Sequence, residues 1–147
     1  MDIVAQTIIV SAGVFFLTGL VTGVIKYRQI IASESAQAHP YINICNRAAL
    51  MYAFAAILLL TFAEISQLPI SVEMVAVCAI LLYFAASIAI YLVHGLMRDT
   101  DNQLRLPAKL GQRTIPKSLI SLFMWTLIFA EIGGFFVLFY GVLEEIF

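Results

Sequence analysis

The sequence contains four apolar runs that are each long enough to cross a bilayer, and this feature limits the fold more than any other. The runs cover residues 3–25, 48–68, 74–97 and 118–143. A hydrocarbon core of about 30 Å needs roughly 20 such residues per helix, and backbone groups in lipid must be satisfied within the protein. The runs therefore predict an all-α fold, an integral membrane four-helix bundle in one domain over residues 1–147. The expected helices cover about 3–26, 41–68, 73–97 and 117–143.

The composition excludes several other classes of protein. Apolar side chains make up 63% of the residues and charged ones 12%, against about 45–50% and about 25% in an ordinary soluble domain. A disordered chain, a collagen, a nucleic-acid-binding domain and a disulfide scaffold are all excluded by these values. The sequence contains no Ser-His-Asp constellation, no phosphate-binding glycine loop and no metal-binding cysteine cluster. Composition thus defines the class and leaves the chemistry open.

The positive charges predict the orientation in the membrane. All eight flank or occupy the first and third connections between the expected helices. They are Lys26, Arg28, Arg47, Arg98, Arg105, Lys109, Arg113 and Lys117. Because Lys and Arg accumulate in cytoplasmic loops, we expect both larger connections to be cytoplasmic and both termini to lie outside. The expected location is a bacterial inner (plasma) membrane, and these cations set the topology and bind lipid headgroups or hold a specific anion.

Small residues along the helices predict close helix packing. Gly19 and Gly23 form a GxxxG pattern, small residues cluster over 85–89, and Gly133 and Gly134 are adjacent in the last helix. Small side chains let helix backbones approach closely in lipid. Four helices make a thin bundle, so we also expect a homo-oligomer that shares a site between chains.

Two carboxylates lie inside the apolar runs. Glu131 is about 21 Å along its helix from Lys117, and Glu64 is about 25 Å from Arg47. No Lys or Arg lies in that half of the membrane, and an ionised carboxylate there is costly. We expect Glu131 to be protonated or hydrogen-bonded to neutral side chains such as Thr126, and Glu64 to reach toward the outer surface. The pair handles protons or binds a ligand, or it orients the helices through interhelical hydrogen bonds.

Both histidines lie at the expected cytoplasmic boundary. His39 precedes Pro40, which is well suited to the first turn of a helix, and His94 is on the last turn of the third helix. Two imidazoles at one depth can hold a haem iron axially, or one can do so while the other contacts substrate. Arg47 and Arg98 are candidates to pair with carboxylates such as the haem propionates. The alternative is that both histidines only face water and headgroups. Further polar aromatic candidates are Tyr41, Tyr52 and Tyr91.

The first half of the chain resembles a family of small membrane isomerases. The segment FLTGLVTG at 16–23 is followed by a polar loop, by Ala38-His39, and by an asparagine before an apolar helix. This pattern, over about residues 15–60, is similar to the four-helix styrene oxide isomerases and hydroxylaminobenzene mutases. The resemblance implies a trimer with haem b bound through His39, in which the iron acts as a Lewis acid. It also implies that Asn46 or Asn43 orients the substrate.

The chain departs from that family at several positions. The family places five residues between its histidine and asparagine, whereas six separate His39 from Asn46, and the family's next glycine is Arg47 here. The third helix has tyrosines such as Tyr91 but no acid or amide, and His94 is an added histidine. The chain also resembles, more superficially, the glutathione-linked membrane proteins of eicosanoid metabolism. Those proteins carry an arginine-tyrosine pattern on their later helices, and this chain lacks it.

Three functions follow from these observations. The first is a haem-b-binding membrane isomerase that acts on a small apolar substrate, with Asn43, Asn46 and Tyr91 around the reacting group and His39 and His94 as possible iron ligands. The second is a bis-histidine haem protein that transfers electrons through His39 and His94. The third is a non-enzymatic membrane subunit or binding protein.

Overall fold

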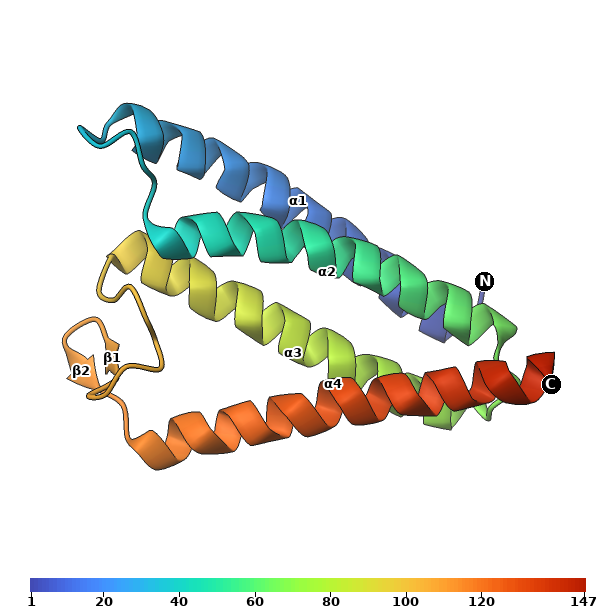
Figure 1. The fold of residues 1–147 in the computed structure, drawn as a ribbon. Helices are drawn as coiled ribbons and strands as arrows, with labels where there is room; N and C mark the ends of the chain where they lie inside the picture. The colour runs from blue at the N-terminus through green and yellow to red at the C-terminus, as the bar shows by residue number, and fades with distance from the viewer.

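The computed structural model describes residues 1–147 and contains four long helices and one small ribbon of two strands (Figure 1). In chain order the elements are α1 (Ile3–Ile31), α2 (Pro40–Ile65), α3 (Ile70–Met97), β1 (Lys109–Leu110), β2 (Arg113–Thr114) and α4 (Lys117–Ile146). All four helices are long and apolar enough to cross a membrane. These helices confirm the helical class and support a multi-pass membrane protein.

The helix boundaries differ from the expected ones near prolines and polar residues. Helix α1 continues to Ile31, five residues beyond its predicted end, because the polar residues after Ile25 are mostly good helix formers. Helix α2 ends at Ile65 and α3 begins at Ile70. Pro69 caps α3, and a residue before proline is disfavoured in helical geometry. Glu73, expected as the first residue of this helix, therefore lies within its first turn.

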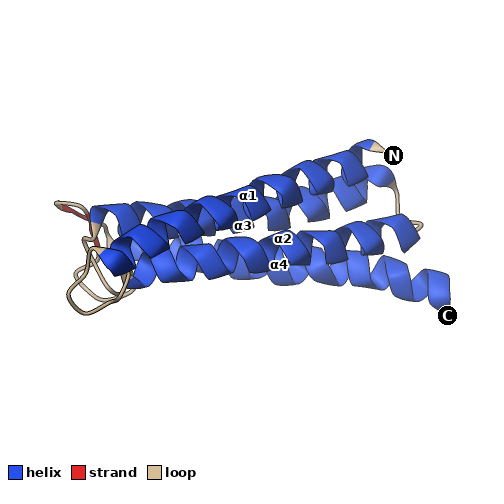
Figure 2. Cartoon of the chain, turned by 90° about the horizontal axis from the view of Figure 1, so that it is seen from above, coloured by secondary structure: helices blue, strands red, loops and turns tan.

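The helices run alternately up and down, so the two termini lie at the same end of the bundle (Figures 1 and 2). We call this the terminal end. The opposite end, with the connections 32–39 and 98–116, is the loop end. All eight Lys and Arg residues belong to helix segments or connections near the loop end. The arrangement matches the predicted separation of charge along the bundle.

Glycine at the helix contacts accounts for part of the close packing. A Cβ on Gly19 would lie 2.6 Å from Leu50 Cδ2, so α2 approaches α1 at this point. A Cβ on Gly134 would lie 2.8 Å from the Ala76 carbonyl oxygen of α3. Gly133 faces open space instead. The packing role predicted for the small residues therefore holds at Gly19 and Gly134, and fails at Gly133.

Helix α4 is the least embedded helix. The cluster of 16 buried apolar residues comes from α1, α2 and α3, with Leu138 as its one member from α4. In Figure 1, α4 crosses close to α3 near the terminal end and diverges from it toward the loop end. This divergence leaves room for a pocket beside the 98–116 connection.

Candidate functional site

The best-defined polar pair in the molecule joins His94 to Asp99 at the loop end. His94 is on the last turn of α3 and is 3% exposed. Its Nδ1 lies 2.7 Å from Asp99 Oδ1. Arg98 ends the helix in a left-handed conformation with φ of 51°, which is a common way to terminate a helix. The resulting reversal brings Asp99 back beside a residue five positions earlier.

Asp99 also holds the β1–β2 ribbon. Its Oδ2 accepts a hydrogen bond from the Gly111 backbone N–H, and Gly111 has a φ of +59° in the turn of the ribbon. Burial alone raises the pKa of Asp99, but the hydrogen bonds from Gly111 and His94 outweigh burial and hold the pKa below its ordinary value. Since an ionised carboxylate only accepts hydrogen bonds, His94 donates through Nδ1 and keeps Nε2 as its free ring nitrogen.

A pocket of about 440 Å³ adjoins His94 between α3, the 98–116 connection and α4. Ten of its 12 lining residues are hydrophobic, and its walls include Val93, Leu119 and Phe123. The two polar residues in the lining are His94 and Gln103. The Gln103 Oε1 atom is buried and has no hydrogen-bond partner. We call this space the His94 pocket; its size is typical of a site for a small ligand.

Tyr41 connects the helices to this pocket. Its hydroxyl accepts a hydrogen bond of 2.6 Å from the Gln103 backbone N–H. Its ring centroid lies 5.2 Å from that of His94, 6.2 Å from that of His39 and 6.0 Å from that of Tyr91. The structure therefore gathers His39, His94, Tyr41 and Tyr91 at one end, although no direct ring contact joins the two histidines.

His39 serves as the N-cap of α2. Its Nδ1 accepts a hydrogen bond from the Tyr41 backbone N–H at 3.3 Å, and its own backbone N–H donates to Gln29 Oε1 at 2.9 Å. Burial, and after it the positive charge of Arg98, lowers the pKa of His39 below 6.5. One nitrogen of the neutral ring is thus used in capping the helix.

The asparagines and arginines singled out in the sequence lie elsewhere. Asn46 donates through Nδ2 to the Gly19 carbonyl oxygen at 2.7 Å, so it links α2 to α1. Asn43 has a buried Oδ1 without a partner. Arg47 and Arg98 are exposed and form no ion pair with a carboxylate. None of these four side chains lines the His94 pocket.

The two carboxylates within the apolar runs make no interhelical hydrogen bond, which was one of the two roles considered for them. Glu131 is near the middle of α4, and its Oε1 is buried without a partner. Thr126 donates instead to the carbonyls of Leu122 and Phe123 in its own helix, as short hydroxyl side chains commonly do. Glu64 is exposed at the end of α2, in agreement with its predicted reach toward the surface.

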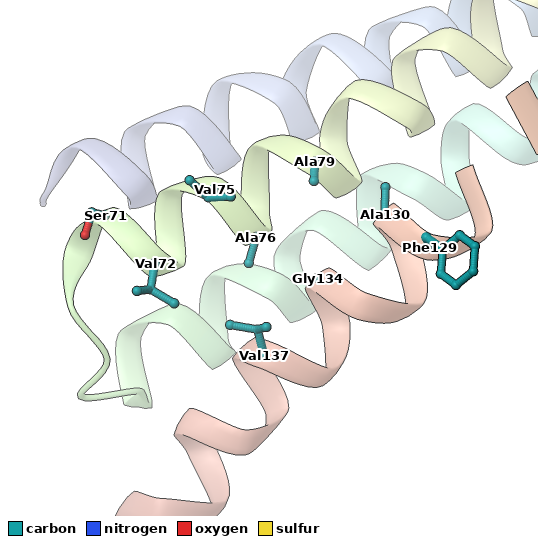
Figure 3. Close-up of a pocket in the computed structure, with 9 residues that line it drawn as sticks. All are labelled: Ser71, Val72, Val75, Ala76, Ala79, Phe129, Ala130, Gly134 and Val137. Atoms are coloured by element: carbon teal, nitrogen blue, oxygen red, sulfur yellow. The ribbon is translucent and has the colours of Figure 1, made fainter. Parts of the chain in front are cut away.

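A second pocket between α3 and α4 has no chemically reactive lining. It has a volume of about 530 Å³ and seven hydrophobic residues among its nine. Figure 3 shows Ala76 and Ala79 of α3 opposite Ala130 and Gly134 of α4, with Ser71 supplying the one hydroxyl. The pocket results from small residues on two diverging helices.

Sequence reasoning missed the partners of His94. Asp99 follows the helix end within a polar segment, and Gly111-Gln112 stands between two short extended segments, which is a weak signal for a tight turn. Comparison of the chain with models of known families, with curated proteins and with solved structures finds no significant match.

Proposed function

We propose that this chain is a membrane isomerase that binds a small apolar substrate in the His94 pocket and uses His94 as its reactive centre. The observation that carries the proposal is the Asp99–His94 pair at the wall of an apolar pocket. A buried carboxylate fixes the tautomer and orientation of the imidazole beside it. The same arrangement prepares a histidine to transfer a proton or to bind a metal.

The lining of the pocket suggests the class of substrate. Its hydrophobic walls favour an apolar molecule, and the unpartnered Gln103 Oε1 offers one hydrogen-bond acceptor. An apolar ligand with a single oxygen fits this lining, because the Gln103 side-chain amide also carries N–H groups that can donate to that oxygen. Tyr41 fixes the Gln103 backbone through its hydroxyl, so the position of this acceptor is tied to α2.

An isomerisation suits one histidine held by one carboxylate. In an aryl epoxide, His94 Nε2 removes a proton from the methylene carbon, and the C–H electron pair forms a C=C bond as the benzylic C–O bond breaks. The same nitrogen then returns the proton to the benzylic carbon of the enolate, which gives the aldehyde. Asp99 stabilises the positive imidazole that exists between the two transfers. The substrate loses and regains one proton, so no further reactant is required.

The haem implied by the resemblance also has a fitting ligand in this chain. His94 Nε2 is the free nitrogen of a ring that a carboxylate orients, which is the usual arrangement of a metal-bound histidine. Arg47 and Arg98 lie at the same end without ion-pair partners and would pair with propionates. When bound, the iron would supply a Lewis acid for an epoxide oxygen. His39 Nδ1 accepts the Tyr41 N–H, which places the proton of its neutral ring on Nε2. His94 is therefore the better iron ligand, and this favours a single-histidine site over the bis-histidine electron carrier.

The placement in the membrane belongs to the same proposal. The clustering of Lys and Arg at the loop end supports a cytoplasmic position for that end, both termini outside, and a bacterial inner membrane. The His94 pocket then lies at the cytoplasmic boundary, where an apolar substrate arrives through the lipid. The resemblance further suggests a homotrimer.

Turnover of a small aryl epoxide by the purified protein tests the proposal. We expect wild type to convert styrene oxide to its aldehyde isomer, His94→Gln to lose at least about 100-fold of this rate, and His39→Asn to retain it. A visible spectrum of the same samples reports the cofactor. A Soret band that is lost in His94→Gln alone indicates iron on His94, and turnover without a Soret band indicates proton transfer by the imidazole. A His94→Gln rate equal to wild type would overturn the proposal, and so would a wild-type rate no higher than that of membranes lacking the protein.

A further inference from the structure

The terminal end of the bundle contains a cleft lined by three carboxylates. This cleft has no part in the function proposed for the His94 pocket. The cleft has a volume of about 650 Å³ and lies where α1 begins, α2 ends and α3 begins. Asp2, Glu64 and Glu73 line it together with Ser66. We call it the acidic cleft. It is independent of the proposed isomerase site, which lies at the opposite end of the molecule.

The three carboxylates have no cationic side chain to neutralise them. All Lys and Arg residues lie toward the loop end, and none of the three acids forms an ion pair. Asp2 Oδ1 accepts from the Ala5 N–H at 2.7 Å and thereby caps α1. Glu64 is exposed at the rim. The Met1 amino group also lines the cleft but forms no ion pair with these acids, so the negative groups of the cleft outnumber its one positive group.

Glu73 is the one carboxylate of the cleft that is buried without a hydrogen-bond partner for one of its oxygens. It is 5% exposed, and its Oε1 is buried without a hydrogen-bond partner. The first turn of a helix favours a carboxylate through the helix dipole, and Glu73 is in the first turn of α3. The dipole accounts for the charge, but no N–H of that turn donates to Oε1. Burial of a carboxylate oxygen without a hydrogen-bond donor costs free energy. A ligand that donates a hydrogen bond to Glu73 Oε1 would remove this cost.

We propose that the acidic cleft binds an organic ammonium group, with Glu73 as its principal counter-ion and Glu64 as a weaker one at the rim. Nowhere in the chain do three metal-ligating side chains converge, so the carboxylates are too dispersed to enclose a metal ion. The cleft is also larger than a bare ion requires, and Ala5, Ala63 and Leu68 give it an apolar side. A charged amine with a small apolar substituent matches this lining.

The ammonium group can come from a free amine or from the headgroup of a lipid. Binding of benzyltrimethylammonium, measured by calorimetry on protein in lipid nanodiscs, separates the two sources. Phosphatidylglycerol discs contain no ammonium group, whereas phosphatidylcholine discs present one at every headgroup. Affinities are expressed relative to the probe concentration at the surface of the matching empty discs, because anionic phosphatidylglycerol attracts the cationic probe. Equal affinity in both discs then indicates a free amine as the ligand, and an affinity about tenfold weaker in phosphatidylcholine indicates a lipid headgroup.

Substitutions in the cleft test the assignment. We expect saturable binding above that of empty discs, a loss of about tenfold or more in Glu73→Gln, and a loss of about threefold or less in Glu64→Gln. Glu145→Gln is the matched control outside the cleft and should bind as wild type. Ala63→Leu fills the apolar side without touching a charge, and it should weaken binding even if Glu73→Gln does not fold. Wild type that binds no more probe than empty discs would overturn the proposal, as would a folded Glu73→Gln variant or an Ala63→Leu variant with wild-type affinity.

Discussion

The Asp99 carboxylate joins two elements that are distant in sequence, since one oxygen contacts His94 Nδ1 at 2.7 Å and the other accepts the Gly111 N–H. This pair of bonds fixes the imidazole at the end of α3 and the turn of the ribbon at the same time. The wall of the His94 pocket and the orientation of its histidine are therefore coupled through one side chain. Substitution of Asp99 affects both.

Asp99→Asn is expected to lower the turnover or ligand affinity of the His94 pocket by about 10–100-fold. The neutral amide no longer stabilises a positive imidazole and no longer accepts at both oxygens. Turnover kinetics with the epoxide measure the effect. Asp101→Asn is the control, because Asp101 is exposed and pairs only with the exposed Arg105. Equal rates in Asp99→Asn and Asp101→Asn would contradict a role for the Asp99–His94 pair.

Tyr41→Phe is expected to loosen the 98–116 connection. It removes the acceptor of the Gln103 N–H, which costs about 0.5–1.5 kcal/mol. Hydrogen exchange of the Gln103 amide should become faster, while amides in the middle of α3 keep their protection. Tyr91→Phe is the control, since Tyr91 stacks on the same ring but has no role in holding the connection. If Tyr91→Phe accelerates this exchange as much as Tyr41→Phe, the hydrogen bond is not what holds the connection.

Gly19→Ala is expected to destabilise the contact between α1 and α2 by about 1–3 kcal/mol. The added Cβ would lie 2.6 Å from Leu50, and it would also disturb the carbonyl that Asn46 binds. Gly13→Ala is the matched control, because a Cβ there meets nothing within 4 Å and alanine is the better helix former. Thermal unfolding in detergent measures both. A Gly19→Ala protein as stable as Gly13→Ala would contradict the close approach.

Acidification is expected to destabilise the loop end. The folded pKa of His39 is lowered from 6.5 by burial and by Arg98, so the unfolded chain takes up a proton first as the pH falls through 6.5, and stability decreases. Asp99 also has a lowered pKa, and its contribution is lost at more acidic pH, when the folded carboxyl becomes protonated. Melting temperatures between pH 7.5 and 5 measure the first effect. Asparagine in His39→Asn keeps the N-cap but does not titrate, so the melting temperature of this variant should depend less on pH. A pH dependence equal to that of wild type would assign the loss of stability to other groups.

The long-range order of the helices was predictable from the sequence because apolar runs of this length have few alternatives. The meeting of His39 and His94 at one end follows from the same alternation, since one begins a helix and the other ends the next. The Gly19 contact was also predictable, because its pattern belongs to helix packing in lipid.

The partners of individual polar groups were not predictable. Asp99 reaches His94 only because Arg98 adopts a left-handed conformation. It reaches Gly111 only because the short strands β1 and β2 pair and place the turn between them beside Asp99. Asn46 was expected near a substrate, but its side chain satisfies the Gly19 carbonyl of α1. Which face of a nearly uniformly apolar helix turns inward is determined by packing, and periodicity carries little of that information in this chain.

The ¹⁵N NMR spectrum of the His94 ring tests the central claim most directly. In protein prepared without haem at pH 7, we predict a proton on Nδ1, a bare Nε2, and a shift of the Nε2 signal when a non-reactive analogue of the epoxide fills the His94 pocket. His39 should not respond to the analogue. A proton on Nε2, or an Nε2 signal indifferent to the analogue at saturating concentration, would contradict the presentation of His94 to the pocket by Asp99.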